Sequence, residues 1–283
     1  MRSRRRPRAH SGAASPRARS VTVGDLTFSI VGAETQAQAP ATSRTRYVLI
    51  HGIGTSHHYF AGLHRELART ADTWSVDLPG FGGTPKPAAS PTVHEMAAAL
   101  GVVLDHWGGP PYVLIGHSMG AQWAVELARV RPDLVAAVVL IGPVVDRAHR
   151  SLRAQLLALL IDACKEPPRV NTLAVMAYLR CGPRYFLRQA KQMKRYRTEA
   201  AVSDLRVPIL VLRGARDPVA GARWARELRD TARAGSLVTV PGRAHAVHAT
   251  APRSVARAVR AFARERVTDG TSFGGDGPPL AHA

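Results

Sequence analysis

The feature that most constrains the fold of this chain is a series of short apolar runs, each followed closely by Gly or Pro. Runs of this length without polar alternation are typical of strands buried on both faces of a parallel sheet. Helical patterns lie between them, as in β-α-β units with right-handed crossovers. The expected strands are residues 47–50, 74–78, 112–115, 136–141, 209–212 and 237–240.

Two local signals mark where the first elements begin. Residues 21–23 and 26–31 flank a Gly24-Asp25 turn, which predicts a β-hairpin ahead of the apolar runs. Thr92 and Glu95 form the T-x-x-E pattern of a helix capping box, and an apolar stripe at helical spacing follows it. We therefore expect an α/β protein with helices on the faces of its sheet.

One region breaks the alternation of strands and helices. Residues 145–203 show helical patterns throughout and contain no expected strand. An insertion that follows a strand lies over the edge of the sheet where open α/β folds bind ligands, so we interpret this region as a helical cap. The expected organisation is a disordered Arg-rich tail at 1–19, a core at 20–144 and 204–267, the cap at 145–203, and a disordered tail at 268–283.

The chain is strongly basic, with a formal net charge of +19. Such a balance is typical of proteins that bind nucleic acids or anionic membranes. Residues 1–20 carry seven Arg and no acid, and elsewhere Arg recurs at helical spacing on faces expected to be solvated. Aromatic residues are not interleaved with the Arg residues, so we expect no specific nucleic-acid partner. Polyanion binding through the basic surface is kept as an alternative function.

The segments that would direct the chain to a membrane are not found in this sequence. No stretch approaches the roughly 18 apolar residues of a membrane span, and the basic N-terminal residues are not followed by an apolar signal-peptide region. A cytoplasmic location is therefore expected. Cys164 and Cys181 form no C-x-x-C pair, which gives no support to a zinc ribbon or a redox motif.

The strongest chemical signal is Gly116-His-Ser118-Met-Gly120, a G-x-S-x-G pattern between an expected strand and an expected helix. A strand that turns this sharply into a helix holds its middle residue in a strained conformation. Only glycine on either side lets the backbone pass closely enough. The turn would project the Ser118 hydroxyl above the sheet edge, at a helix N-terminus that favours negative charge. Ser118 is therefore the candidate nucleophile.

A serine nucleophile needs a base, and the base needs an acid that holds it in one tautomer. Asp217 and His245 each follow an expected strand closely, in the order Ser, acid, His that accompanies this turn. All three side chains should meet at one edge of the sheet. The less favoured alternatives are His248 as base and Asp146 or Asp77 as acid.

A glycine loop, His51-Gly-Ile53-Gly54, follows the strand at 47–50 and should turn backbone N–H groups toward the nucleophile. We expect the oxyanion hole to consist of the N–H groups of Ile53 and Met119. His51 is expected to brace this loop. The nearby His57, His58 and His64 could suggest a metal site, but no H-E-x-x-H or carboxylate spacing supports one, so no metal or cofactor is expected.

Five segments stand out together: His51-Gly-Ile-Gly, Asp77-Leu-Pro-Gly-Phe-Gly-Gly83, Gly116-His-Ser-Met-Gly120, Arg213-Gly-Ala-Arg-Asp217 and Gly242-Arg-Ala-His245. Taken together, they resemble the α/β-hydrolase fold family over about residues 20–266. The resemblance implies a mostly parallel eight-stranded sheet with a helical cap, and acyl transfer through an acyl-enzyme. Ser118 stands where epoxide hydrolases and haloalkane dehalogenases of this family use Asp, which argues against both activities.

The favoured hypothesis is a carboxylesterase-like serine hydrolase that cleaves a small-to-medium hydrophobic ester. The alternatives on the same three residues are a C–C bond hydrolase and a thioesterase. The sequence gives neither the substrate nor the oligomeric state. Candidate pocket residues in the cap are Leu156, Leu160, Met176 and Phe186, and an acidic substrate would have Arg180, Arg184 and Arg188 available.

Overall fold

The computed structural model describes residues 17–33, 45–107, 111–146 and 151–268 of the 283-residue chain. The expected tails at 1–19 and 268–283 lie mostly outside these residues. Where the two overlap, β1 begins at Arg17, so residues 17–19 form part of a strand.

The strands form one eight-stranded sheet in the order β1-β2-β4-β3-β5-β6-β7-β8. The β1/β2 and β2/β4 pairs are antiparallel and the other five are parallel, which confirms the mostly parallel sheet. The N-terminal hairpin therefore forms the first edge of the sheet. The strands are β1 Arg17–Val23, β2 Leu26–Ala33, β3 Arg46–Ile50, β4 Asp72–Asp77, β5 Tyr112–His117, β6 Val135–Ile141, β7 Ile209–Gly214 and β8 Gly235–Val240.

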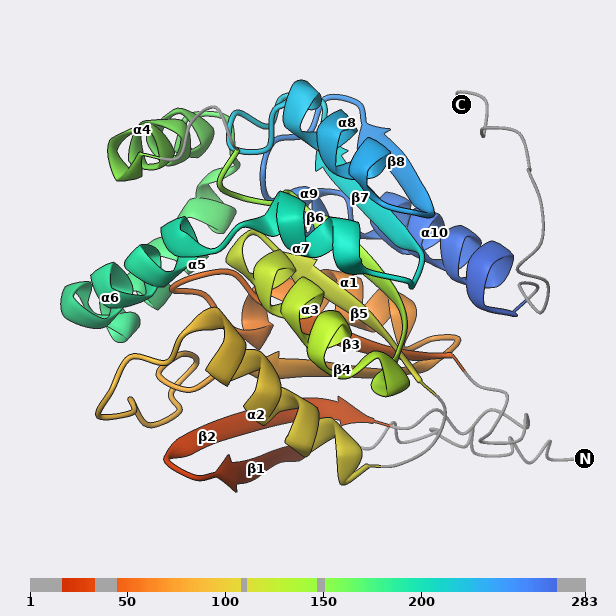
Figure 1. Cartoon of the computed structure of the whole chain (residues 1–283). Coiled ribbons are helices and arrows are strands. Elements are labelled where there is room, and N and C mark those ends of the chain that lie inside the picture. The colour runs from red at the N-terminus through yellow and green to blue at the C-terminus, as the bar shows by residue number, and fades with distance from the viewer. Residues whose placement is uncertain (1–16, 34–44, 108–110, 147–150, 269–283) are drawn as a thin grey trace, which may run out of the picture.

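Helices cover both faces of the sheet, so strands such as β3 are buried on both sides (Figure 1). Val48 and Ile50 face a core cluster that includes residues of α2, α3 and α8, whereas Tyr47 and Leu49 face a cluster that includes α1 and α10. The flanking elements are η2 His57–Phe60, α1 Ala61–Leu67, α2 Val93–Asp105, α3 Met119–Val130, η3 Pro132–Leu134, α8 Ala222–Thr231, α9 Val247–Thr250, α10 Pro252–Ala263 and η5 Arg264–Thr268.

The expected capping box begins α2. The Thr92 hydroxyl accepts a hydrogen bond from the backbone N–H of Glu95 at 3.1 Å, and the Glu95 carboxylate accepts one from the N–H of Thr92 at 2.8 Å. Two of the N–H groups that every helix start leaves without an intrahelical partner are satisfied in this way.

Four helices separate β6 from β7: α4 Leu152–Ala163, α5 Pro168–Cys181, α6 Pro183–Arg195 and α7 Thr198–Asp204. Helical patterns without a strand were expected in this region, and its described residues contain helices and no strand. Figure 1 shows α4, α5 and α6 together on the left of the molecule, on the side away from α10.

Buried polar contacts fasten α6 to the core. The Tyr185 hydroxyl donates to the carbonyl of Pro79 at 2.7 Å, in the turn after β4. The Gln189 amide donates to the carbonyl of Pro91 at 3.1 Å, just before α2. From the core side, the Gln122 amide of α3 donates to the carbonyl of Met193 at 3.1 Å. Because these groups are buried, each contact would be costly to break.

Within the described residues, every helix is too short or too polar to cross a bilayer.

Candidate active site

Ser118 occupies the sharp turn between β5 and α3, with φ 56° and ψ −121°, a conformation that is strained for a residue with a side chain. Glycines allow the close contacts around it. A Cβ on Gly116 would collide with the carbonyl of Gly120, and a Cβ on Gly120 would collide with the carbonyl of Ile50. The backbone N–H of Ser118 donates to Ile141 of β6 at 2.9 Å. The turn expected from the G-x-S-x-G pattern is therefore present.

Asp217 lies in the loop after β7 and is 3% exposed. Its Oδ1 accepts hydrogen bonds from the backbone N–H groups of Val219 at 2.8 Å and Ala220 at 2.9 Å. Its Oδ2 lies 3.0 Å from Nδ1 of His245. Burial would raise the pKa of this carboxyl, but the nearby His245 and the two N–H donors outweigh burial and lower its pKa.

His245 follows β8 and is almost fully buried. Burial would lower the pKa of its imidazole, but the charge of Asp217 and the hydrogen bond to it outweigh burial, so the pKa is raised. Its Nε2 is buried and has no hydrogen-bond partner among the described residues. Since Nδ1 donates to Asp217, Nε2 is the nitrogen left to accept a proton.

His245 and Ser118 lie at the same edge of the sheet although they are far apart in the sequence. His117, the neighbour of Ser118, lies with its ring centroid 4.7 Å from that of His245 and its Nε2 3.2 Å from the His245 carbonyl. Gly142, just after β6, lies beside both His245 and Asp217. A Cβ there would be 2.9 Å from the His245 ring and 3.2 Å from Oδ2 of Asp217.

Two acids that the sequence analysis did not select hold the backbone of His245. Oδ1 of Asp162, in α4, accepts from the N–H of His245 at 2.9 Å. Oε1 of Glu166, just after α4, accepts from the N–H of Ala246 at 2.7 Å. Burial raises the pKa of both carboxyl groups. The sequence signal that could have identified them is the spacing of these two acids, four residues apart at the end of a mostly apolar helix and just after it.

The alternative base, His248, lies in different surroundings. Its ring is fully buried and packs against Phe60 and His117, with ring centroids 4.6 Å and 4.2 Å away. Burial lowers its pKa to about 3, with a smaller contribution from His245. Neither ring nitrogen has a hydrogen-bond partner among the described residues. His248 is therefore a neutral core residue at neutral pH.

The alternative acid Asp77 faces His57 instead of His245. Its Oδ1 accepts from the His57 backbone N–H at 2.6 Å, and its Oδ2 lies 2.6 Å from the His57 Nδ1. Asp77 thus fixes the start of η2. The other alternative, Asp146, is partly buried after β6.

His51 braces the glycine loop, as expected. Its Nε2 accepts from the backbone N–H of Leu78 at 3.1 Å, so its Nδ1 carries the proton that is shared with the Gly52 carbonyl at 2.7 Å. Burial lowers its pKa, which favours this neutral form. A Cβ on Gly52 would lie 3.0 Å from Cβ of Ser118, so this loop passes directly beside the serine.

The three histidines considered for a metal site do not converge on one point. His57 binds Asp77, and Nδ1 of His64 lies 2.8 Å from the Ser75 hydroxyl. The His58 ring contacts only the His57 ring among the aromatic rings described, at a tilt of 40° and with centroids 3.9 Å apart. In the ranges that the structure describes, no group of three or more His, Cys, Asp or Glu side chains is placed to hold a metal ion.

The candidate pocket residues of the cap do not share one environment. Phe186 is half-buried and packs on Tyr178, with ring centroids 5.3 Å apart, and Tyr178 lies against Gly54. Leu160 and Met176 are exposed instead. The Leu156 side chain lies outside the described part of the chain. Arg180, Arg184 and Arg188 are all exposed.

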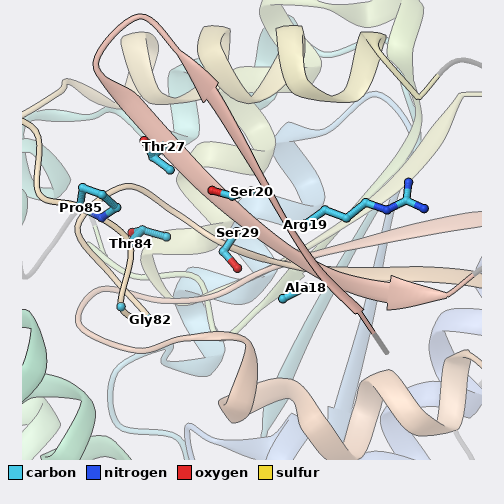
Figure 2. A pocket seen from close by; sticks show the side chains of 9 residues that line it. Ala18, Arg19, Ser20, Thr27, Ser29, Gly82, Thr84 and Pro85 are labelled. Carbon is cyan, nitrogen blue, oxygen red and sulfur yellow. The ribbon is translucent and has the colours of Figure 1, made fainter. Parts of the chain in front are cut away.

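A shallow cavity of about 270 Å³ lies away from these residues, between the β1–β2 hairpin and the turn that contains Gly82 to Pro85 (Figure 2). Arg19 is the one charged residue that lines it, and no candidate catalytic residue does. The cavity therefore has no part in the arrangement around Ser118.

Comparison with known proteins decides the family. Residues 48–163 match a family described as alpha/beta hydrolase fold, and residues 171–271 match one described as TAP-like protein. The chain belongs to the α/β-hydrolase fold family. The resemblance drawn from the motifs is confirmed.

Two curated relatives of this α/β-hydrolase show how far the likeness extends. The chain is 40% identical over 103 residues to lipase LipV of Mycobacterium tuberculosis. The matched region covers 35% of this chain and only 38% of the lipase. The chain is 24% identical over 240 residues to (E)-2-((N-methylformamido)methylene)succinate hydrolase of Acinetobacter baylyi, covering 76% of this chain and 89% of that enzyme.

Among solved structures, an esterase from a Rhodococcus species superimposes on this α/β-hydrolase with a TM-score of 0.72. The two are 19% identical, and the match covers 89% of this chain and 99% of that one. At this identity the likeness concerns the fold alone.

Proposed function

We propose that this hydrolase cleaves small-to-medium hydrophobic esters through an acyl-enzyme formed on Ser118. The observation that carries the proposal is the His245–Asp217 contact of 3.0 Å at the sheet edge where the strained Ser118 turn lies. A buried imidazole whose Nδ1 is held by a carboxylate, and whose Nε2 has no partner among the described residues, is the arrangement that a general base requires.

In the proposed reaction, the Ser118 hydroxyl attacks the ester carbonyl while Nε2 of His245 takes its proton. Asp217 keeps Nδ1 protonated and stabilises the imidazolium. His245 then gives the proton to the leaving alcohol, and an acyl-enzyme remains. Water, deprotonated by His245, attacks the acyl group and releases the acid together with Ser118.

The oxyanion of each tetrahedral intermediate would be bound by the backbone N–H groups of Ile53 and Met119. Neither N–H has an acceptor among the described residues, and Met119 is the first residue of α3, where the helix dipole favours negative charge. Such donors typically contribute about 3–4 kcal/mol to transition-state stabilisation.

The α4–α6 helices are the proposed cap over this site. Two cap side chains, Tyr178 and Phe186, lie next to the glycine loop. Both would contact a Cβ placed on Gly54. Their rings favour a hydrophobic acyl or alcohol group. Arg180, Arg184 and Arg188 are exposed, which does not favour their binding a buried acidic substrate. C–C hydrolysis of an acidic diketone is therefore the less favoured alternative, and the test below includes it.

The test is hydrolysis of p-nitrophenyl esters from acetyl to decanoyl by the wild type, Ser118→Ala and the control Ser203→Ala, which removes an exposed hydroxyl on α7. We expect Ser118→Ala to lose about 10⁶-fold in turnover and Ser203→Ala to match the wild type. Activity retained by Ser118→Ala would refute the mechanism.

A fluorophosphonate probe tests the nucleophile independently of the substrate. Labelling that requires Ser118, together with no hydrolysis of any ester, would keep the nucleophile and reject the ester substrate. Thioesters and acidic diketones would then be assayed in its place. Absence of labelling on folded protein would reject Ser118 as an activated serine.

A further inference from the structure

The large apolar side chains on the surface of this protein are concentrated on the proposed cap. The structure exposes nine large hydrophobic side chains among the described residues, and eight of them lie on α4, α5 and α6. The ninth is Val102 on α2. We call the eight the α4–α6 face: Leu157, Leu160, Ile161, Leu173, Val175, Met176, Leu179 and Leu187.

These side chains do not belong to the core of the protein. In α5, Val170 and Cys181 are buried, whereas Leu173, Val175, Met176 and Leu179 are exposed. Leu179 is 76% exposed. Soluble monomers rarely leave so many large apolar side chains together at the surface, and such patches mark sites that contact a partner.

The three helices of the face stay together. The Asn171 amide at the start of α5 donates to the carbonyl of Ala163 at the end of α4, at 2.7 Å. Tyr178 of α5 packs against Phe186 of α6. Figure 1 shows these three helices projecting from one side of the molecule. Because the three helices are neighbours, a single partner could contact more than one of them.

The charge around the face indicates the kind of partner. Residues 151–197 contain only two acids, Asp162 and Glu166, and both are buried against the His245 loop. All basic side chains of this segment are exposed. They are Arg153, Lys165, Arg169, Arg180, Arg184, Arg188, Lys191, Lys194, Arg195 and Arg197. The surface is thus apolar and cationic, without an exposed acid.

We propose that the α4–α6 face docks on the surface of an anionic phospholipid bilayer. Exposed Leu, Ile and Met side chains would enter the boundary between headgroups and acyl chains while the surrounding Arg and Lys bind lipid phosphates. A second copy of this chain fits less well, because pairing two such faces would bring ten exposed cations on each side together without an exposed acid between them. Docking lies beyond the ester hydrolysis proposed above and does not depend on it.

The experiment is co-sedimentation of the full-length chain with vesicles of phosphatidylglycerol and phosphatidylcholine, compared with vesicles of phosphatidylcholine alone. The test variant combines Leu160→Asp with Leu179→Asp, two exposed positions on α4 and α5. The control combines Val102→Asp with Ala200→Asp, two exposed positions outside the face that change the net charge equally. Circular dichroism checks that every variant is folded.

We expect wild type and control to bind anionic vesicles at least tenfold more tightly than the test variant, and to bind phosphatidylcholine weakly. Arg184→Gln with Arg188→Gln should reduce the salt dependence of binding. All variants keep the basic residues 1–16. If the test variant still binds anionic vesicles, another part of the chain is responsible for the binding and the proposal is overturned. Absence of wild-type binding would also overturn it, and a dimer that the test variant dissociates would identify a second copy as the partner.

Discussion

The carboxylate of Asp162 accepts a hydrogen bond from the backbone N–H of His245, at 2.9 Å, across 83 positions of sequence. Glu166 makes the matching contact with the N–H of Ala246. Two buried acids at the end of α4 thus fix the segment that carries the proposed base, and their charges add to that of Asp217 in raising the pKa of His245. The C-terminal end of α4, in the proposed cap, is therefore fastened to the loop that carries the proposed base.

Replacing Asp162 with Asn separates the two effects of this contact. The amide oxygen can still accept from the His245 N–H, but the negative charge that favours the imidazolium is lost. A base acts when it is neutral, so kcat/KM should rise with pH through the pKa of His245. The Asn variant should shift this rising limb to lower pH, and its plateau should stay within about tenfold of wild type.

The measurement is the pH profile of kcat/KM between pH 5 and 9 for wild type, Asp162→Asn and Asp162→Ala. Asp162→Ala also removes the acceptor, so its plateau should fall further. An Asn profile whose limb stays in place would mean that Asp162 acts on His245 only through position.

Asp217→Asn tests the acid that was predicted from the sequence. The Asn amide can present N–H to Nδ1 of His245 and favour the tautomer in which Nε2 carries the proton, so Nε2 cannot accept one from Ser118. We expect kcat to fall about 10⁴-fold without loss of the fold. Asp146→Asn, at the alternative acid, should retain activity; the reverse pattern would exchange the two assignments.

Gly142→Ala should damage activity by steric displacement. Gly142 has φ 54°, which disfavours a side chain, and the new methyl would lie 2.9 Å from the His245 ring. Moving a catalytic group by about 1 Å can cost about 100-fold in rate, and we expect a kcat loss of this order. Gly221→Ala is the matched control, because nothing lies within 4 Å of that Cβ. Full activity of Gly142→Ala would show that the pair tolerates displacement.

His248 should make the protein sensitive to acid. Its pKa is lowered to about 3 from a model-peptide value of 6.5, mainly by burial. Between these values the unfolded chain binds a proton that the folded chain does not. The free energy of unfolding should therefore fall as the pH drops from about 6.5 toward 3, by about 1.4 kcal/mol per pH unit for this group.

Urea unfolding of His248→Leu at pH 7 and pH 5 measures this contribution. The variant should lose less stability on acidification than the wild type, whatever its stability at pH 7. His106→Leu is the control, because it removes an exposed imidazole that is solvated in both states. An unchanged pH dependence in His248→Leu would place the acid sensitivity elsewhere, for example at buried His117, whose pKa is also strongly lowered by burial.

Local patterns were sufficient to predict much of the fold. A single sharp turn is specified by the strand at 112–115, the motif Gly116-His-Ser118-Met-Gly120 and the helix after it. At Gly116 and Gly120 the backbone passes too close to its neighbours for a side chain. The Thr92–Glu95 cap could also be predicted, because both partners lie within one helical turn. The position of β1 was less clear, because Arg17–Arg19 resemble the polar tail that precedes them.

The sequence by itself determined the order of strands and helices, the serine turn and the set of acids and histidines that follow the later strands, because these depend on residues close together in the chain. Only the tertiary structure decided that Asp217 contacts His245, that His248 is a buried core residue and that Asp77 binds His57. It also decided that Asp162 and Glu166 turn inward while Leu160 and Met176 face solvent. The side of a helix that is buried depends on the elements packed against it, and an apolar helix such as α4 carries no local pattern that specifies the side.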